Sequence, residues 1–533
     1  MKLHALGHSS YILEMRNSDD ESVRILADPW ITDYVIGDLM ARFPRIRIDY
    51  ERLPEIHGIF LSHAHTDHFC PYSLIELWRE LPNAPVILLP QSLAYLQELL
   101  HEHLEECSIF VLEQGEAIDF FGLSLSALFN LERRPTNEDD VMMLVVESEQ
   151  EVFFSECDAL LPFYDEAARE AISTYLGGEG QGLDTAVFLT TKNELGATMA
   201  SFNAKSLEDR ATFVAGAEDK INEEIEEIYT PMPHLYPDLW QNERLVRLIG
   251  GQGIAFPTRV NPDFNRVLFP VRLADRVEME REAADEQELL HQIDVFEPGF
   301  IHELSDGELV DRERCPYLEL LDDESDREFD GELEVFDTFP IAPLRSELRD
   351  FDPQEQRILA MLNERFLPYL IGRREPPIEH LLADVDECTY VVRVRYGNAA
   401  EWEDRDYEIT FGDLRFTRES TGGTADEFYW ANDLEDYLTG RCDDFSTFCR
   451  APLPGTARRF WDALGMPFLN NDLVVAKMRF HFERAAEGRT PEEWVLPFYD
   501  VPPIEEEDGA DDEDDEDEAL DDAYEGAFDD DEI

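Results

Sequence analysis

Short apolar runs alternate with helix-like patterns over about the first 275 residues of the chain. Runs at 11–15 and 23–27, separated by the polar residues 17–20, predict a β-hairpin. A third run at 59–61 leads into a histidine-rich loop, after which apolar residues recur at helical spacing from Leu74 to Leu81. By the same criteria we predict further strands at 86–89, 141–146, 152–154 and 184–190 and a helix over 93–104. Such alternation is typical of a layered α/β domain, which we place at residues 1–275.

The sequence after residue 275 changes character more than once. Residues 276–345 are rich in Glu and Asp, and we interpret them as an acidic connecting segment. Residues 346–503 predict a smaller α+β domain, with helical patterns at 358–366, 433–438 and 456–464 and strand-like patterns at 390–396 and 407–411. Residues 504–533 are too acidic and too poor in apolar side chains to offset the entropy of ordering, so we expect a disordered tail.

The strongest chemical signal is the segment 62–68, which reads Ser-His-Ala-His-Thr-Asp-His directly after an apolar strand. Three imidazoles and a carboxylate within six residues form a dense set of metal ligands. A tight loop can direct His63 and His65 to one ion while Asp67 and His68 face another about 3.5 to 4 Å away. We therefore predict these four residues as ligands of one or two divalent metal ions.

This segment resembles the signature H-x-H-x-D-H of the metallo-β-lactamase superfamily, which it matches without a gap. The segments Gly7-His8-Ser9-Ser10 and Leu26-Ala27-Asp28-Pro29-Trp30 are similar to the start of the branch that contains ascorbate-phosphate lactonase. The resemblance covers about residues 1–275. It implies an αββα sandwich that holds metal at one edge of its two sheets.

The resemblance also implies ligands from later parts of the chain. Asp158, which follows the strand at 152–154, is similar to the carboxylate that bridges two ions. A further histidine ligand is expected between residues 110 and 150, but that stretch contains none. Asp139 or Asp140 could supply an oxygen ligand instead, or either could be a surface turn residue. The remaining implied positions are His234 as the last histidine ligand, or a loop residue, and His8 and Asp28 behind the ligands, with His8 alternatively a turn residue.

A hydroxylase type acting on CMP-N-acetylneuraminate is similar in also lacking that histidine. The likeness rests on Asp28-Pro29-Trp30, on His65-Thr66-Asp67-His68 followed by Pro71, and on short segments at 448–452 and 460–461. That type carries a Rieske cluster, which needs C-x-H and C-x-x-H pairs, and this sequence contains neither. A centre with fewer imidazoles suits iron as well as zinc, so the metal stays open between the two.

Charge decides which partners are excluded. The chain has 120 acidic and 44 basic residues, a net charge of −76, and only 19 of the carboxylates lie in residues 505–533. Such a surface repels nucleic acid and anionic membranes. Only 5 of the basic residues are Lys, a composition that suits a salt-rich cytoplasm, where ions screen the repulsion. No run approaches the ~20 apolar residues of a membrane span and the start does not resemble a secretory signal, so we expect a cytoplasmic protein.

These observations lead to one favoured function and two alternatives. We expect a metal-dependent hydrolase that acts on a small phosphoryl or acyl substrate, with Asp67 or Asp158 orienting or deprotonating a metal-activated water. The first alternative is a non-haem iron oxygenase that needs an external reductant. The second is a catalytically degenerate protein that keeps its metal for structure. The seven cysteines form no C-x-x-C pair and are expected to be reduced thiols.

Overall fold

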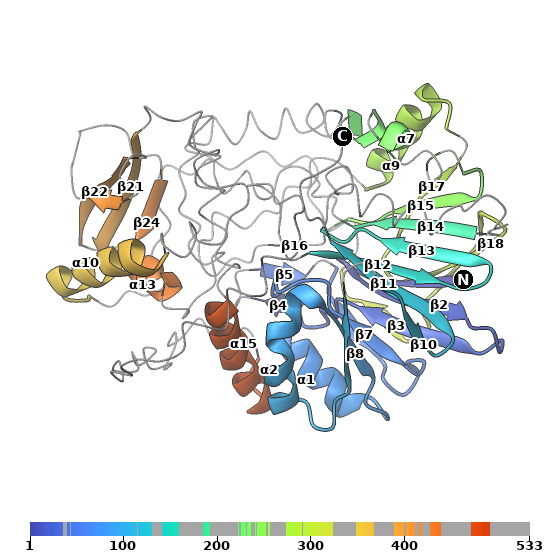
Figure 1. Cartoon of the computed structure of the whole chain (residues 1–533), viewed down its shortest axis with the longest axis horizontal. Coiled ribbons are helices and arrows are strands. Elements are labelled where there is room, and N and C mark those ends of the chain that lie inside the picture. The colour runs from blue at the N-terminus through green and yellow to red at the C-terminus, as the bar shows by residue number, and fades with distance from the viewer. Residues whose placement is uncertain are drawn as a thin grey trace, which may run out of the picture. The chain divides into compact units, whose positions relative to one another are not determined.

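The structure is a computed structural model. Figure 1 colours the parts of the chain that it describes. They are residues 1–35, 40–42, 44–113, 116–129, 141–158, 185–191, 242–251, 273–289, 291–322, 348–366, 389–398, 401–410, 415–417, 427–438 and 471–490, with 222, 225–226, 228–230, 232–235, 240 and 254–255. None of the helices in these ranges is long and apolar enough to cross a lipid bilayer.

Two mixed β-sheets form the body of the N-terminal part (Figure 1). The first has eight strands in the order β19-β18-β1-β2-β3-β7-β8-β9. Its strands are β1 (Lys2–Gly7), β2 (Ser10–Arg16), β3 (Ser22–Ala27), β7 (Gly58–Phe60), β8 (Val86–Pro90), β9 (Ile109–Leu112), β18 (Phe300–Ser305) and β19 (Glu308–Arg314). From β3 to β9 the neighbouring strands run parallel, and the remaining pairs run antiparallel.

The second sheet has seven strands in the order β10-β11-β12-β13-β14-β15-β17. They are β10 (Ile118–Phe120), β11 (Leu123–Phe129), β12 (Met142–Glu147), β13 (Glu151–Ser155), β14 (Thr185–Thr190), β15 (Leu245–Ile249) and β17 (Gln292–Val295). The strands from β13 to β17 are parallel neighbours. Short strands complete two small sheets, which are β4 (Tyr34–Val35), β5 (Met40–Arg42) and β16 (Ile254–Ala255), and β6 (Ile46–Ile48) with β20 (Leu318–Leu320).

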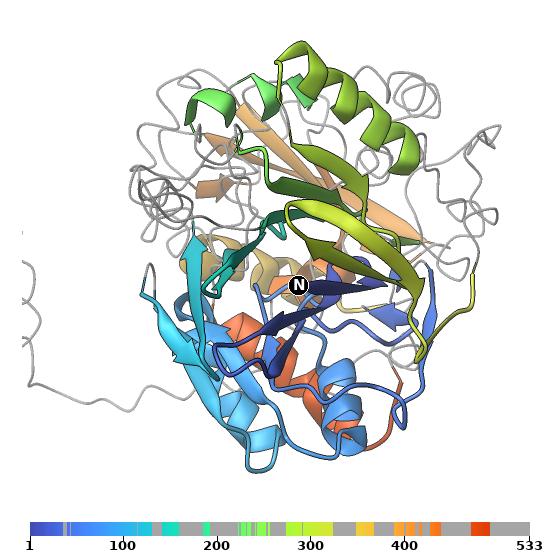
Figure 2. The ribbon, with the colours of Figure 1, turned by 90° about the vertical axis from the view of Figure 1, so that its right-hand side faces the viewer.

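Alternation along the strands produces two apolar layers. Val246 and Leu248 of β15 face the core between the two sheets, which also contains Tyr11 of β2 and Phe153 of β13. Leu245 and Ile249 point the other way and pack with residues of α9 (Leu273–Glu286). On the first sheet, α1 (Pro71–Glu80) and α2 (Gln97–His103) lie beside β7 and β8, as Figures 1 and 2 show. Helix, sheet, sheet and helix therefore form the expected αββα sandwich.

The acidic segment predicted as a connection belongs largely to the sandwich, which corrects the boundary at residue 275. Helix α9 covers the second sheet, β17 pairs with β15, and β18 pairs with β1. Strand β19 is the outer edge of the first sheet, so most of its side chains face solvent and are charged. That exposure explains why the sequence resembles a linker. The first sheet extends to Arg314, and β20 then pairs with β6 in a small separate sheet.

Residues 348–438 contain the mixed helices and strands expected of a smaller α+β unit. Its four-stranded sheet has the order β23-β22-β21-β24. Two helices pack together through Gln354 and Arg357, which both bind the Glu435 carboxylate. The elements are α10 (Phe351–Ala360), a π-helical turn (Met361–Phe366), β21 (Thr389–Gly397), β22 (Trp402–Thr410), β23 (Arg415–Thr417), β24 (Glu427–Trp430) and α13 (Ala431–Leu438). The predicted helix at 456–464 and the tail at 504–533 lie outside the described residues.

The last described helix, α15 (Asn471–Ala486), packs against α1 and α2 of the sandwich (Figure 1). Its Phe482 ring stacks on His103 of α2 with centroids 5.0 Å apart. The same ring meets Phe69, one residue beyond the histidine-rich loop, at 6.2 Å. The sequence predicts a separate C-terminal domain for this region, but in the structure this helix extends the helical layer of the sandwich.

Candidate metal centre

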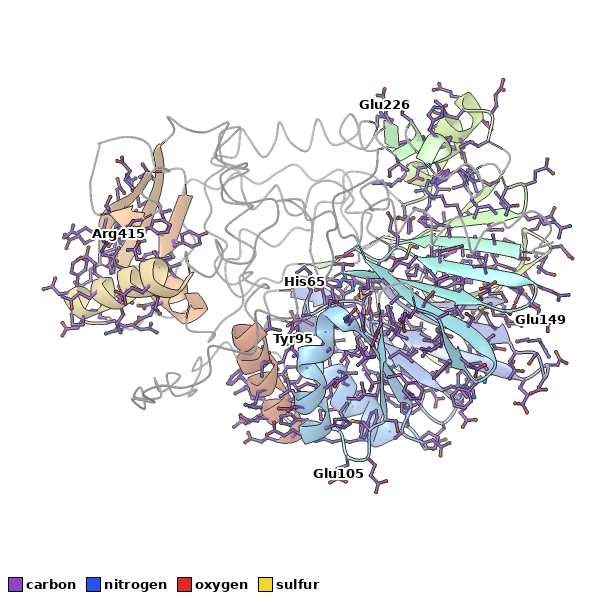
Figure 3. The ribbon with its side chains drawn as sticks, in the orientation of Figure 1. His65, Tyr95, Glu105, Glu149, Glu226 and Arg415 are labelled. Atoms are coloured by element: carbon purple, nitrogen blue, oxygen red, sulfur yellow. The ribbon has the colours of Figure 1, made fainter. Side chains whose placement is uncertain are left out.

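The histidine-rich segment is the loop that joins β7 to α1, and Figure 3 shows His65 at one edge of the sandwich. The loop is tied by turn hydrogen bonds from the amides of His68 and Phe69 to the His65 carbonyl oxygen. Ala64 and Phe69 are fully buried and anchor it in the core. Pro71 then begins α1, because a helix tolerates proline in its first turn. All four predicted ligands of the loop are consequently buried and held in place.

A first group of three side chains joins this loop to the second sheet. His63 Nε2 lies 2.8 Å from His65 Nδ1 and 3.8 Å from Asp158 Oδ2. Asp158 follows β13, so the two sheets contribute to the same cluster. One ligand atom from each of the three residues lies within 4.8 Å of the others, a spacing that a metal ion can bridge.

A second group consists of His8, Asp67 and His68. Asp67 Oδ2 lies 3.0 Å from His8 Nε2 and 3.6 Å from His68 Nε2. His68 Nε2 is also 3.5 Å from Asp158 Oδ2. Asp158 therefore approaches His63 of the first group and His68 of the second with the same carboxylate oxygen. The two groups are contiguous and share this acidic side chain.

Asp28, directly after β3, organises both groups from behind. Its carboxylate accepts hydrogen bonds from the Ser62 amide (2.7 Å), the Ser62 hydroxyl (2.6 Å) and His68 Nδ1 (3.0 Å). The Cys157 thiol donates to Asp28 Oδ2 as well, at 3.1 Å. With its proton at Nδ1, a neutral His68 presents a lone pair at Nε2 toward Asp67 and Asp158. A histidine that donates one ring N–H to a carboxylate and directs its other nitrogen to the ion is typical of metal sites.

Ser62 orients His63 in a similar way. The Ser62 hydroxyl has one proton and gives it to Asp28, so it accepts a hydrogen bond from His63 Nδ1 at 2.9 Å. A neutral His63 then has its lone pair at Nε2, the atom that faces His65 and Asp158. The Nε2 atoms of His63 and His68, which contact neither Ser62 nor Asp28, are thus the atoms that point into the cluster.

The carboxylates of the cluster favour a positive charge on the groups beside them. Burial raises the pKa of Asp67, but His68 and His8 outweigh it and bring the pKa to about 2. Burial lowers the pKa of His68, whereas the Cys157 sulfur and the Asp158 and Asp67 carboxylates raise it well above its usual value. Burial dominates for His8, whose pKa is lowered, and for the Cys157 thiol, whose pKa is raised.

The residues of the cluster fit a metal ion. Asp67 Oδ1 is buried and has no hydrogen-bond partner among the described residues. Opposite it, Asp158 presents further lone pairs to the same small space, and so does His68 Nε2 once an ion replaces its proton. Lone pairs that face one another need a cation between them, and imidazole and carboxylate are ligands of zinc and of iron.

Backbone strain gathers around the cluster. His8, Asp28 and Cys157 all have positive φ angles, of 51°, 42° and 52°, in a conformation that few residues other than glycine adopt. Strained residues of this kind persist only where the surrounding structure holds them, and they concentrate at functional sites. Cys157 is the residue that the sequence analysis missed. It lies directly before Asp158, and that position beside a predicted ligand was the available signal.

The predicted site residues differ in where the structure places them. His63, His65, Asp67, His68 and Asp158 lie together, with Asp28 behind them and His8 in direct contact with Asp67. His234 is exposed on the four-residue helix α7 (Met232–Leu235) and belongs to neither ligand group. It is also absent from the third possible group among the described residues, which consists of His63, His68 and Cys157. Its predicted ligand role gains no support from this placement. Asp139 and Asp140 lie outside the described residues.

Comparison with known proteins adds limited information. No protein-family model matches the chain. A protein of Mycolicibacterium smegmatis, provisionally named as a Rieske 2Fe-2S iron-sulfur protein, is 28% identical over 90 residues. The match covers 17% of this chain and only 16% of that relative.

Solved structures resemble the chain with low similarity. CmlA, a diiron β-hydroxylase from Streptomyces venezuelae, has 12% identity and a TM-score of 0.33, covering 57% of this chain and 54% of its own. The metallo-β-lactamase fold protein YhfI from Bacillus subtilis has 9% identity and a TM-score of 0.30, covering 57% and 99%. Zinc-bound PqqB from Methylobacterium extorquens has 12% identity and a TM-score of 0.22, covering 34% and 58%. The sandwich and its ligand loop are therefore described from this chain's own topology and contacts, and membership of the superfamily stays a prediction, as does the branch.

Proposed function

We propose that this chain is a metal-dependent hydrolase of the metallo-β-lactamase superfamily that acts on a small phosphoryl or acyl substrate. The observation that carries the proposal is the position of Asp158. One of its oxygens faces a histidine nitrogen of each ligand group, at 3.8 Å and 3.5 Å. A carboxylate shared in this way is what a pair of neighbouring ions requires.

The side chains have distinct roles in this proposal. His63, His65 and Asp158 would hold one divalent ion, and Asp67 and His68 would hold the second. Bound ions supply a water of lowered pKa and polarise a phosphoryl or carbonyl oxygen. Asp67 stays ionised at neutral pH because its pKa is about 2, and its Oδ1 atom can orient that water. Burial of the cluster excludes bulk water and strengthens each electrostatic contact.

One observation favours a second candidate, a non-haem iron oxygenase. The first ligand group, His63, His65 and Asp158, combines two histidines with one carboxylate, the ligand set of many non-haem iron enzymes. The chain has no C-x-H or C-x-x-H pair to bind a Rieske cluster, so an external reductant would be required. A degenerate centre that only stabilises the fold is the third possibility.

The charge of the chain supports proposals about its partners and location. With a net charge of −76, the protein is proposed to bind neither nucleic acid nor anionic membranes and to work on a small molecule. A salt-rich cytoplasm is the proposed location.

Metal analysis of protein purified without added metal tests these proposals. Two zinc ions per chain, with hydrolysis of aryl phosphate or acyl ester substrates, would support the hydrolase. Iron, with oxygen consumption that depends on an added reductant, would favour the oxygenase. A protein that binds metal but catalyses neither reaction would support the degenerate centre.

Single substitutions test whether the side chains of the cluster bind the metal. We expect His63→Ala and His65→Ala each to lower the metal content by one ion without unfolding the protein. The matched control is His101→Ala, which removes an exposed histidine of α2 and should leave the metal content unchanged. Full metal occupancy in both ligand variants would contradict the assignment.

A further inference from the structure

His8 is held in an unfavourable backbone conformation at the metal centre. It forms the turn between β1 and β2 with a φ of 51° and is only 2% exposed. The buried Arg42 fixes the turn through hydrogen bonds from Nη2 to the carbonyl oxygens of Leu6 and Gly7. The turn is fixed further by a hydrogen bond from the Ser9 hydroxyl to Thr191 at 3.0 Å. This clamping keeps the imidazole in one place despite the strain.

The His8 imidazole faces Asp67 and His68, the other two members of the second ligand group. His8 Nε2 is 3.0 Å from Asp67 Oδ2, and its ring centre is 5.2 Å from that of His68. The edge of the ring meets Trp30 at 5.0 Å, which fixes its tilt. Two atoms that bind one ion at about 2.1 Å lie about 3.0 to 3.4 Å apart, depending on coordination geometry. The observed separation of Nε2 and Oδ2 is therefore suitable for two ligands of a single ion.

We propose that His8 is the third protein ligand of the second metal position, together with Asp67 and His68. The proposal rests on the metal centre of the proposed function and goes beyond the resemblance, which places a histidine from the end of the domain at this position. His234, the residue implied for that role, is exposed on a short helix. A histidine from the first turn of the chain fills the coordination position instead.

The alternative is that His8 only orients Asp67 by a hydrogen bond, and glutamine separates the two roles. In His8→Gln the amide can still donate to Asp67, but a neutral amide is a poor ligand for zinc or cobalt. His8→Asn is the second variant. Asparagine tolerates a positive φ and is shorter than glutamine, so this variant should fold even if the glutamine of His8→Gln does not fit. His4→Gln is the matched control, since His4 is a buried histidine of the neighbouring strand β1 and contacts Tyr317.

The experiment is a titration of metal-free full-length protein with Co²⁺, followed by visible absorption and by the metal-to-protein ratio. We expect two binding events in the wild type and in His4→Gln. In His8→Gln and His8→Asn the second event should be lost or weakened at least about tenfold, with an altered absorption band. Circular dichroism confirms folding of each variant.

Two results are distinguishable as failures. If the wild type binds two ions and His8→Gln binds both with the same affinity and spectrum, His8 orients Asp67 and the inference is overturned, while the proposed function stands. If the wild type binds no Co²⁺, the metal centre itself is wrong and both proposals fall together.

Discussion

At the residue scale, Asp28 accepts more hydrogen bonds from the site than its position behind the ligands suggests. Four donors from three residues converge on its two oxygens. Asp28→Asn replaces one oxygen with an NH₂ group, which cannot accept from His68 or Cys157. We expect metal affinity to fall about 10- to 100-fold. The free energy of unfolding should fall by about 1 to 3 kcal/mol, because buried donors lose their acceptor.

The control for this change is Asp20→Asn. Asp20 is also an aspartate with a positive φ, of 62°, but it lies in an exposed turn and pairs with the exposed Arg16. Its substitution should change neither metal affinity nor stability by more than about 0.5 kcal/mol. Competition with a chromophoric chelator and urea unfolding measure the two quantities. Equal effects of both substitutions would remove Asp28 from the site.

We expect the protein to lose stability in mild acid because of the buried His302. Its buried Nε2 atom accepts a hydrogen bond from the Glu297 amide, and burial, reinforced by Arg312, lowers its pKa from 6.5 to about 4. A histidine whose pKa is lower in the folded state takes up protons preferentially on unfolding. Its contribution is therefore complete above about pH 6.5 and is lost as the pH falls toward 4. The expected loss at about pH 4.5 is about 2 to 3 kcal/mol.

His302→Gln tests this origin, because glutamine can accept the same hydrogen bond without titrating. Between pH 7 and about pH 4.5, the wild type should lose about 2 to 3 kcal/mol more unfolding free energy than the variant. Urea titrations at the two pH values give the difference. A parallel decline of both proteins would show that other groups cause the acid sensitivity.

At the scale of single elements, α15 provides a test of the packing between distant parts of the chain. Phe482 is fully buried between His103 and Phe69. We expect Phe482→Ala to lower the unfolding free energy by about 3 to 5 kcal/mol, because a large cavity is left. Arg479→Ala on the same helix removes only an exposed ion pair with Glu102 and should cost less than about 1 kcal/mol. Similar losses in the two variants would mean that α15 is not docked as described.

The elements that the sequence predicts correctly are those whose pattern is complete within a few residues. Strands β2, β3 and β8 and helix α1 alternate or repeat at their own period and are buried on at least one face. Strand β19 has no such signal, because it lies at the edge of the sheet, next to β18. Strand β18 in turn joins the sheet by pairing with β1, about 300 residues earlier in the chain. Local periodicity carries no information about such long-range pairing.

The same distinction applies to the candidate site. His63, His65, Asp67 and His68 are neighbours in sequence, so their chemistry could be predicted from the loop alone. The contact between His8 and Asp67 joins residues 59 positions apart, and that between Cys157 and Asp28 joins residues 129 apart. Only the folded sheets bring these pairs together. The proposed role of His8 therefore rests on distances in the folded structure.

At the scale of the whole molecule, the excess of acidic residues dominates stability. Repulsion among 76 uncompensated negative charges opposes the compact state, and salt shortens its range to about 3 Å at 1 M. We expect the melting temperature to rise by at least several degrees between low salt and about 2 M KCl. The control is a chain ending at residue 503, because only 19 carboxylates lie in 505–533 and most of the rise should remain. Stability that does not depend on salt would contradict this account.

The pairing of β1 with β18 also determines when the protein can fold during its synthesis. Lys2, Leu3 and His4 at the start of the chain pair with Glu303, His302 and Ile301. At about 5 to 20 residues per second, a ribosome needs roughly 15 to 60 s to reach that partner after β1 has been made. Throughout this time β1 presents an open edge next to the turn that carries His8. The nascent chain therefore completes the first sheet late, and chaperones have a long interval in which to protect that edge.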